Sequence, residues 1–311
     1  MDIDAKIYVA GHRGMVGSAI VRRLERGGYT ELVTPSRQEL DLLDQRAVFD
    51  FLAEEKPDYV FLAAAKAGVI HAENTYPTDF ISENVSIQNN LIHGAVKAGI
   101  KDLCFFASSC IYPRDCPQPM KEEYLLSGPL ERAGEPCAID KIAGIKLCES
   151  CNRQHGTRFS SVIPANLYGP NDKYDLAHSR VVPALIRKAH EAKQRGDTEC
   201  IVWGSGKPMR ELLYVNDLAD ACVFLMEQED GIRDSIINIG TGTDISIREL
   251  AETVMDVVGY TGNIFYDSSK PDGTSRKLLD VSRMKRLGWK AKTPLRMGIA
   301  NAYASYVGTL D

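Results

Sequence analysis

The feature that most constrains the fold is a glycine-rich turn near the N-terminus. It lies between a short β-rich run at residues 6–10 and an amphipathic stretch at 15–26. The turn reads Gly11-His12-Arg13-Gly14-Met15-Val16-Gly17, with the spacing G-x-x-G-x-x-G. Glycines at such a junction permit a tight turn, close approach of the backbone to a pyrophosphate, and close packing of helix on strand. Because the helix N-terminus would offer free N–H groups to phosphates, the context predicts dinucleotide binding rather than an ordinary turn.

Strand and helix patterns alternate along the rest of the N-terminal half. Further strands are expected at 31–34, 59–63, 103–107 and 159–163, separated by helices at 44–55, 77–98 and 136–155. The run at 59–63 is nearly all apolar, which is typical of a parallel strand buried on both faces. Repeated βα units predict an α/β fold with a doubly wound parallel Rossmann sheet.

The alternation loosens after residue 168, where Gly, Pro and Asp cluster. This change predicts a smaller C-terminal substrate lobe, with the chain returning to the sheet around 211–223 and 236–239. We therefore assign two segments to each part of the chain, 1–168 plus 212–240 to the nucleotide-binding domain and 169–211 plus 241–311 to the substrate lobe.

Composition and charge exclude several classes of protein. The 311 residues are 44% hydrophobic and 25% charged, as in an ordinary globular protein. A net charge of -5 argues against a non-specific nucleic-acid binder, which is usually basic. No apolar run approaches the roughly 18 residues of a membrane span. Since the acidic N-terminus does not resemble a signal peptide, we expect a cytoplasmic protein that binds neither nucleic acid nor membrane.

The eight cysteines are expected to remain thiols, because a cytoplasmic chain of this size does not need disulfides. Cys148 and Cys151 form a C-x-x-C sequence within a helical pattern, without a second Cys or His pair at zinc-site spacing. We interpret them as buried thiols and predict no metal site.

The residues after the second predicted strand favour NADP over NAD. An NAD-binding domain usually carries Asp or Glu there for the ribose 2′-hydroxyl. This chain has Pro35-Ser36-Arg37 instead, and Arg37 with Arg13 would bind a 2′-phosphate through charge-assisted hydrogen bonds. Asp41 and Leu42 follow at the place where the adenine would rest.

Several further segments carry a resemblance that covers nearly the whole chain. They are Ala63-Ala64-Ala65-Lys66-Ala67-Gly68-Val69, Ser108-Ser109-Cys110-Ile111-Tyr112-Pro113, Lys141-Ile142-Ala143-Gly144-Ile145-Lys146, Asn166-Leu167-Tyr168-Gly169-Pro170, Trp203-Gly204-Ser205-Gly206, Met209-Arg210-Glu211 and Lys270-Pro271-Asp272-Gly273-Thr274. With these segments in order, the chain resembles the GDP-L-fucose synthase family, the GDP-4-keto-6-deoxy-mannose epimerase/reductases among the extended short-chain dehydrogenase/reductases. The resemblance implies an NADP-dependent enzyme of nucleotide-sugar biosynthesis for a surface polysaccharide such as capsule or lipopolysaccharide.

The same resemblance implies a set of catalytic residues, one of which is replaced. Members of the family reduce a C4 ketone with a Tyr that donates the proton, a Ser that binds the carbonyl, and a Lys that binds the nicotinamide ribose. The matching Ser is Ser108 and the matching Lys is Lys141, but the Tyr position holds Cys137. Positions 137 and 141 would still share one face of a helix, since they are four residues apart.

Three interpretations of Cys137 are open. In the first, its thiol or a water that it holds is the acid, since a thiol has a pKa near 8.5 that the Lys141 ammonium would lower. In the second, Ser108 or Tyr112 has taken over. In the third, reduction is lost or slow, because a well-placed general acid typically contributes about 10²–10⁴-fold.

The epimerase residues are altered as well. The family inverts C3 and C5 with a Cys and a His, which match Cys110 and Arg180 here. Arg is permanently charged and is a poor acid–base partner, and His178 lies two residues away. We therefore expect double epimerisation to be absent, which suits a 4-keto sugar that is reduced without inversion, such as a 6-deoxy-heptose nucleotide.

The resemblance also implies which residues bind the cofactor and the substrate. The expected cofactor residues are Gly11, His12, Arg13, Gly14, Met15, Val16, Gly17, Arg37, Asp41, Leu42, Ala63, Ala64, Ala65, Lys141, Pro164, Asn166, Leu167 and Arg180. The expected substrate residues are Ser109, Lys188, Trp203, Arg210, Lys270 and Asp272. A homodimer is expected through the helices at 78–98 and 137–155.

Two functions are compatible with these residues. One is an NADP-dependent reductase of a GDP-4-keto-6-deoxy sugar, with or without epimerase activity. The other is a catalytically impaired or engineered relative that binds NADP and a GDP-sugar without efficient turnover. Intact Ser108 and Lys141 favour the first, and Cys137 and Arg180 favour the second.

Overall fold

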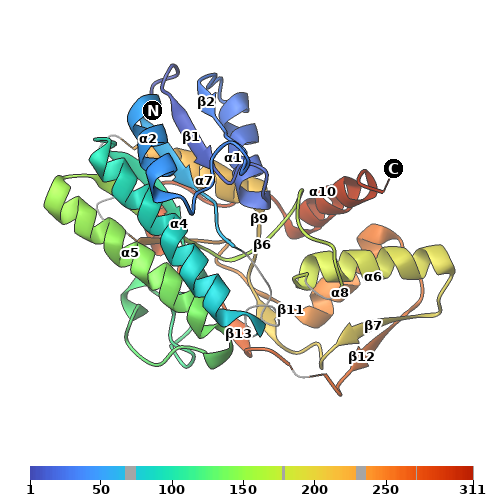
Figure 1. Cartoon of the computed structure of the whole chain (residues 1–311). Helices are drawn as coiled ribbons and strands as arrows, with labels where there is room; N and C mark the ends of the chain where they lie inside the picture. The colour runs from blue at the N-terminus through green and yellow to red at the C-terminus, as the bar shows by residue number, and fades with distance from the viewer. Residues whose placement is uncertain (67–74, 177–178, 229–235, 271, 311) are drawn as a thin grey trace.

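A parallel six-stranded sheet forms the centre of the molecule (Figure 1). The computed structural model describes residues 1–66, 75–176, 179–228, 236–270 and 272–310. The strand order is β10-β5-β4-β3-β1-β2, and every neighbouring pair is parallel. The strands are β1 (Ile7–Ala10), β2 (Leu32–Val33), β3 (Tyr59–Leu62), β4 (Asp102–Phe106), β5 (Arg158–Pro164) and β10 (Ile236–Ile239). The predicted doubly wound α/β fold is confirmed.

Within the described part of the chain, five helices pack around this sheet. Their bounds are α1 (Met15–Arg26), α2 (Gln45–Glu55), α4 (Pro77–Lys97), α5 (Glu135–His155) and α7 (Val215–Met226). Helix α1 packs against α7, whereas α4 packs between α2 and α5. Figure 1 shows α4 and α5 lying side by side along one flank of the molecule. Local signals set some helix ends: the Asp44 carboxylate accepts the Ala47 amide at the start of α2, and α5 ends at Gly156 in the left-handed conformation.

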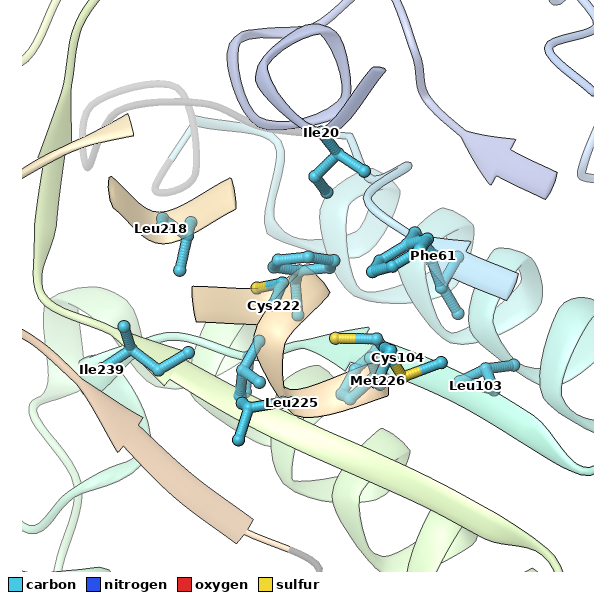
Figure 2. Close-up of a cluster of buried hydrophobic side chains, with 14 of the residues drawn as sticks. Ile20, Phe61, Leu103, Cys104, Leu218, Cys222, Leu225, Met226 and Ile239 are labelled. Atoms are coloured by element: carbon cyan, nitrogen blue, oxygen red, sulfur yellow. The ribbon is translucent and has the colours of Figure 1, made fainter. Parts of the chain in front are cut away.

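The core between the sheet and the helices α1 and α7 is closely packed (Figure 2). Side chains from β3, β4 and β10 meet those of both helices there, among them Ile20, Phe61, Leu103, Cys104, Leu218, Cys222, Leu225, Met226 and Ile239. Burial of these apolar side chains fixes the positions of the strands. The loops that follow β1, β3 and β4 therefore start from rigid supports at one edge of the sheet.

The C-terminal half builds a second cluster of elements, with its own hydrophobic core. Helix α6 (Val181–Arg195), α8 (Ile247–Val258) and α10 (Leu295–Val307) pack together, and α6 also covers the parallel pair β7 (Glu199–Trp203) and β12 (Asn263–Asp267). Figure 1 shows this group beside the main sheet. A three-stranded sheet has the order β11 (Ile245–Ser246), β8 (Met209–Arg210), β13 (Arg276–Lys277). The remaining short elements are η1 (Ser109–Ile111), η2 (Glu122–Tyr124), η3 (Arg132–Gly134) and α9 (Ser282–Arg286).

At 211–223 the chain returns to the main sheet through helix α7, which packs on it, and does not add a strand to it. Strand β9 (Leu212–Tyr214) pairs with β6 (Asn166–Tyr168) in a separate two-stranded sheet, and α7 follows it directly. The predicted return at 236–239 is confirmed, since β10 pairs with β5. The short run at 212–214 is buried and apolar like a core strand, so sequence alone does not tell which sheet it joins. The division into domains stays a prediction.

A buried carboxylate joins segments that are far apart in the sequence. Glu211, only 1% exposed, lies between β8 and β9. Its two carboxylate oxygens accept the backbone amides of Gly242 and Leu279, each at 2.7 Å. Burial raises the pKa of Glu211, and these hydrogen bonds oppose that rise.

Among the described residues, every helix is too short or too polar to span a bilayer. Of the positions named from the sequence, Ala67, Gly68, Val69, His178 and Pro271 lie outside the described residues.

Candidate active site

The glycine turn (residues 11–17) joins β1 to α1, and steric contacts require two of its glycines. Gly11 has a φ of +82°, and a Cβ there would come within 2.8 Å of the Ala64 backbone at the end of β3. A Cβ on Gly17 would collide with the carbonyl of Gly11. The turn therefore packs directly on the neighbouring strand, at the point where the order of the sheet reverses between β1 and β3.

Gly14 differs from the other two glycines, because the protein itself leaves room for a side chain there. A Cβ on Gly14 would meet only the Gly11 carbonyl oxygen, at the ordinary contact distance of 3.5 Å. Gly14 is exposed and is the N-cap residue of α1, and among the described residues no side chain caps that helix. An open surface at an uncapped helix N-terminus fits a phosphate group.

The residues predicted to bind a 2′-phosphate lie on two loops that approach each other. Arg13 and Arg37 are exposed. Hydrogen bonds from Ser36 lower the pKa of the Glu39 carboxylate, and the nearby charges of Arg13 and His12 lower it further. Burial and the Arg13 charge lower the pKa of His12. Glu39 was not predicted, and its proximity shows that the loop carrying Arg37 packs close to the glycine turn.

Asn84 of α4 links the end of β3 to α5. Its side-chain oxygen accepts the Lys66 amide at 2.7 Å, and its amide nitrogen donates to the Asp140 carboxylate at 2.7 Å. Gln88 lies one turn further along α4 and donates to the Asp140 backbone carbonyl, also at 2.7 Å. Burial raises the pKa of Asp140. This link was not predicted from the sequence. A signal was present, because two amide side chains lie four residues apart on the face of α4 that packs against α5.

The end of β4 and the start of α5 bring four of the predicted catalytic residues onto adjoining elements. Ser108, Cys110, Cys137 and Lys141 are called the Cys137 cluster below. The Sγ atoms of Cys110 and Cys137 lie 3.8 Å apart. This contact is a hydrogen bond between the two thiols, and it is the largest cause of the lowered pKa of Cys110. A hydrogen bond with Ser108 and the positive charge of Lys277 lower this pKa further, whereas burial raises it.

Lys141 lies on α5 one turn after Cys137. Its Nζ is 5.3 Å from the ring centre of Phe105, a residue of β4. The ammonium group is thus held over the strand that leads into Ser108.

Lys277 is a second lysine near the two thiols, and its proximity to them was not predicted from the sequence. It belongs to β13, in the C-terminal half of the chain. Burial lowers its pKa, while the interactions with Cys110 and Cys137 raise it. Because Lys277 is remote in sequence from both cysteines, no local pattern could have connected them.

Tyr112 is poorly placed to act as a substitute proton donor. The side chain is 3% exposed, and its hydroxyl donates to the Asn238 side chain at 2.5 Å. Burial raises its pKa well above the ordinary value. A hydroxyl that is buried, hydrogen-bonded in the core and harder to ionise is a poor acid for a ketone in the site.

Arg180 is exposed at the N-cap of α6, where its positive charge lowers the pKa of Asp172 against a larger effect of burial. Asn166 follows β5 and donates to the Glu211 carbonyl at 3.0 Å, which fixes the chain between Pro164 and Leu167. Pro164 ends β5, which lies next to β4 in the sheet, and Asn166 and Leu167 follow it in β6.

The residues predicted to bind substrate gather in two groups on the second lobe. Trp203 is 59% exposed, and the ammonium groups of Lys188 and Lys270 lie 4.7 and 5.7 Å from its ring. Arg210 lies near Asp272, whose charge raises the Arg210 pKa against a larger lowering by burial. Two cations over an exposed aromatic ring offer a base or sugar a flat face, and a diphosphate two positive charges.

Asp272 is held by a neighbouring loop. Its carboxylate accepts the Ser205 amide at 2.9 Å and the Ser205 hydroxyl at 2.6 Å, and these bonds lower its pKa. Ser109 lies instead on η1, half-buried beside Cys110.

Comparison with known proteins agrees with this geometry. Residues 7–240 match the NAD dependent epimerase/dehydratase family. GDP-L-fucose synthase 1 of Arabidopsis thaliana is 53% identical over 306 residues, which are 98% of this chain and 94% of that protein. The chain belongs to the GDP-L-fucose synthase family. The GDP-L-fucose synthase of Escherichia coli K12 is 52% identical over 313 residues, with 98% of both chains covered.

Solved structures extend the family comparison. The GDP-mannoheptose C4 reductase of Campylobacter jejuni with NADP bound matches with a TM-score of 0.91 and 40% identity, over 99% of both chains. This reductase thus matches nearly the whole length of the chain, including its C-terminal half.

Proposed function

We propose that this chain is an NADP-dependent reductase of a GDP-linked 4-keto-6-deoxy sugar, which acts without inverting the carbons beside the ketone. The observation that carries the proposal is the Cys137 cluster, where Cys137 contacts Cys110 and lies one helical turn before Lys141. The chain's similarity to a GDP-L-fucose synthase and to a GDP-mannoheptose C4 reductase supports the substrate class.

The glycine turn supports NADP as the cofactor. The pyrophosphate would lie over Gly14 and the first amides of α1, and Arg13 with Arg37 would hold the 2′-phosphate. Lys141 would hold the nicotinamide ribose. When bound, NADPH supplies the hydride for the ketone.

The protein's own groups bind the carbonyl and deliver the proton. Ser108 would donate a hydrogen bond to the carbonyl oxygen. Cys137, or a water that it holds, would donate the proton to the same oxygen as it becomes an alcohol. The Lys277 charge near both thiols would stabilise the thiolate that remains.

Loss of epimerisation follows from Arg180. Inversion beside a ketone needs one group that removes a proton and another that returns it. Cys110, with its lowered pKa, could be one of these groups, but a permanently charged guanidinium is a poor second. The similar protein from Campylobacter jejuni is named a C4 reductase, and this name describes reduction alone.

The second candidate is a relative that binds NADP and a GDP-sugar without efficient turnover. It is favoured by the burial of Tyr112, which makes that hydroxyl a poor substitute acid and leaves Cys137 and Ser108 as the donors among the three residues considered from the sequence. A thiol is also shorter than a phenol, so it reaches less far towards the ketone.

A homodimer through α4 and α5 also belongs to this proposal. The two helices pack side by side, and Val85 and Ile139 are 37% and 42% exposed on them. Light scattering of the native protein and of a Val85→Glu/Ile139→Glu variant tests this; a dimer that becomes a monomer is expected, and a wild-type monomer contradicts it.

The test of function is NADPH oxidation with enzymatically generated GDP-4-keto-6-deoxy-mannose, followed by NMR of the product. We expect oxidation and a product with unchanged configuration at C3 and C5. Tight NADPH binding without oxidation would favour the second candidate or another keto sugar, and an inverted product would contradict the loss of epimerisation.

A further inference from the structure

The substitution at position 137 creates a pair of thiols in a site where the family, by the matched motifs, has one. Cys110 and Cys137 are both half-buried, and their Sγ atoms are 3.8 Å apart. The two cysteines come from different elements, η1 after β4 and the first turn of α5, which pack against each other. A disulfide has an S–S distance of about 2.05 Å, so side-chain rotation and a small shift of the first turn of α5 would bring the sulfurs together.

We propose that Cys110 and Cys137 form a redox-modification site, in which a peroxide converts the two thiols into an intramolecular disulfide. The bond would tie η1 to the start of α5 across the candidate active site. Forming the bond requires no third side chain and, beyond the small shift of the first turn of α5, no change of the fold.

The chemistry balances with hydrogen peroxide as the oxidant. The Cys110 thiolate attacks one peroxide oxygen, the O–O bond breaks, and the products are Cys110 sulfenic acid and, after protonation, one water. The Cys137 sulfur then attacks the Cys110 sulfur and expels the second water. Two thiols lose two electrons and two protons, and one peroxide becomes two waters.

The surroundings favour Cys110 as the thiol that reacts first. Lys277 is half-buried, and its charge interacts with both cysteines. The hydrogen bond with Cys137 is the largest cause of the lowered pKa of Cys110, and the interactions with Ser108 and Lys277 lower that pKa further, because all three stabilise the thiolate. Peroxides react with the thiolate rather than the thiol, so this site should oxidise earlier than an ordinary cysteine.

The chain contains its own control pair. Cys104 and Cys222 hydrogen-bond to each other, but both are fully buried in the core (Figure 2), and burial raises the pKa of Cys222 well above its ordinary value. Cys148 and Cys151 are also buried, and burial raises the pKa of both. Proximity alone therefore does not distinguish Cys110 and Cys137; proximity, access and a lowered pKa do.

The disulfide would switch off the proposed reduction, and this consequence rests on the proposed function. Cys137 would lose the proton that it donates to the ketone, and a reducing thiol would restore it. The existence of the disulfide itself does not depend on any activity.

The experiment is peptide mapping of the full-length protein after brief treatment with hydrogen peroxide. Alkylation and trypsin digestion without reduction should give a crosslink between the peptides 102–114 and 133–141, with fragmentation placing the bond at Cys110 rather than Cys104. We expect this crosslink to form faster than any Cys104–Cys222 bond by roughly tenfold or more. Dithiothreitol should reverse it.

Two variants sharpen the result. In Cys137→Ser, Cys110 should accumulate sulfenic acid that dimedone traps, because the second thiol is gone. In Cys116→Ser, which removes a half-buried cysteine with a burial-raised pKa, the crosslink should form as in the wild type.

Three outcomes would overturn the proposal: both thiols still alkylated after treatment, a bond to Cys104 instead, or dimedone-trapped Cys110 in the wild-type protein at the same level as in Cys137→Ser. None of these readouts requires turnover. A protein that forms the disulfide but never oxidises NADPH would refute the proposed function and leave this inference standing.

Discussion

The glycine turn and the Cys137 cluster lie at the same edge of one sheet, but their side chains are constrained in different ways. In the glycine turn, Gly11 and Gly17 are required by contacts within the protein, since a Cβ on either would strike backbone. In the Cys137 cluster, the half-buried side chains of Cys110 and Cys137 pack against each other without an equivalent steric requirement. A binding turn built from backbone contacts is hard to change without losing the fold, whereas the groups that would carry the chemistry can change while the fold persists.

The largest effect is expected for Cys137→Tyr. If the cluster is still a reductase site, a phenol four residues before Lys141 should raise kcat by about 10²–10⁴-fold, the usual contribution of a positioned general acid. Single-turnover oxidation of NADPH measures it, with Cys137→Phe as a control that fills the space without a hydroxyl. An equal rate in all three proteins would mean that position 137 never supplies the proton.

Gly14→Ala tests the glycine turn. The protein has room for this Cβ, so the melting temperature should hardly change, but the pyrophosphate would lose its close approach. We expect NADPH binding to weaken by roughly 10- to 100-fold, or about 1.4–2.7 kcal/mol, measured by calorimetry. Gly17→Ala is the matched control, which should lower stability because its Cβ strikes the Gly11 carbonyl. Unchanged affinity in Gly14→Ala would show that the cofactor binds elsewhere.

Arg180→His, placed in the Cys137→Tyr background, asks whether epimerisation was lost at one position. A titratable imidazole at position 180 should restore proton exchange at the carbons beside the ketone. In D₂O the product should gain deuterium roughly tenfold faster than with Arg180, as read by NMR. Arg180→Gln, which removes the charge without adding a base, should gain none. Deuterium uptake as fast with Arg180 as with His at this position would contradict the assignment.

The smallest effect is expected for Lys277→Gln. The ammonium of Lys277 helps to keep the pKa of Cys110 below its ordinary value, so removing the charge should move the pH profile of Cys110 alkylation to higher pH. Mass spectrometry of iodoacetamide-treated protein follows the rate at Cys110, and Cys116 is the internal reference. A profile that stays in place would mean that the hydrogen bonds with Cys137 and Ser108 alone lower the pKa.

Local patterns predicted the fold well because the sequence pattern of each helix or strand lies within a short run of neighbouring residues. The helix predicted at 15–26 is α1 (Met15–Arg26), and the one predicted at 136–155 is α5 (Glu135–His155). Periodic burial and the terminal Gly156 set these bounds. The pairing of β9 with β6 was not predictable in the same way, because it depends on contacts between segments far apart in sequence.

The site was predictable only where a motif contains its own geometry. The glycine turn and the Cys137–Lys141 spacing are of this kind. The contact between Cys110 and Cys137, the approach of Lys277 and the Asn84–Asp140 link join distant parts of the chain. The roles of the substrate residues stay predictions, although the two lysines over Trp203 give them a common position.

The buried carboxylate of Glu211 affects how cooperatively the protein unfolds. Its two oxygens hold the amides of Gly242 and Leu279, so neither segment can leave without stranding a charge in the interior. When the segments around Gly242 and Leu279 unfold, the region around β8 and β9 should therefore unfold at the same time. Calorimetry is expected to record one cooperative transition for the whole chain rather than a separate, earlier one for the substrate lobe.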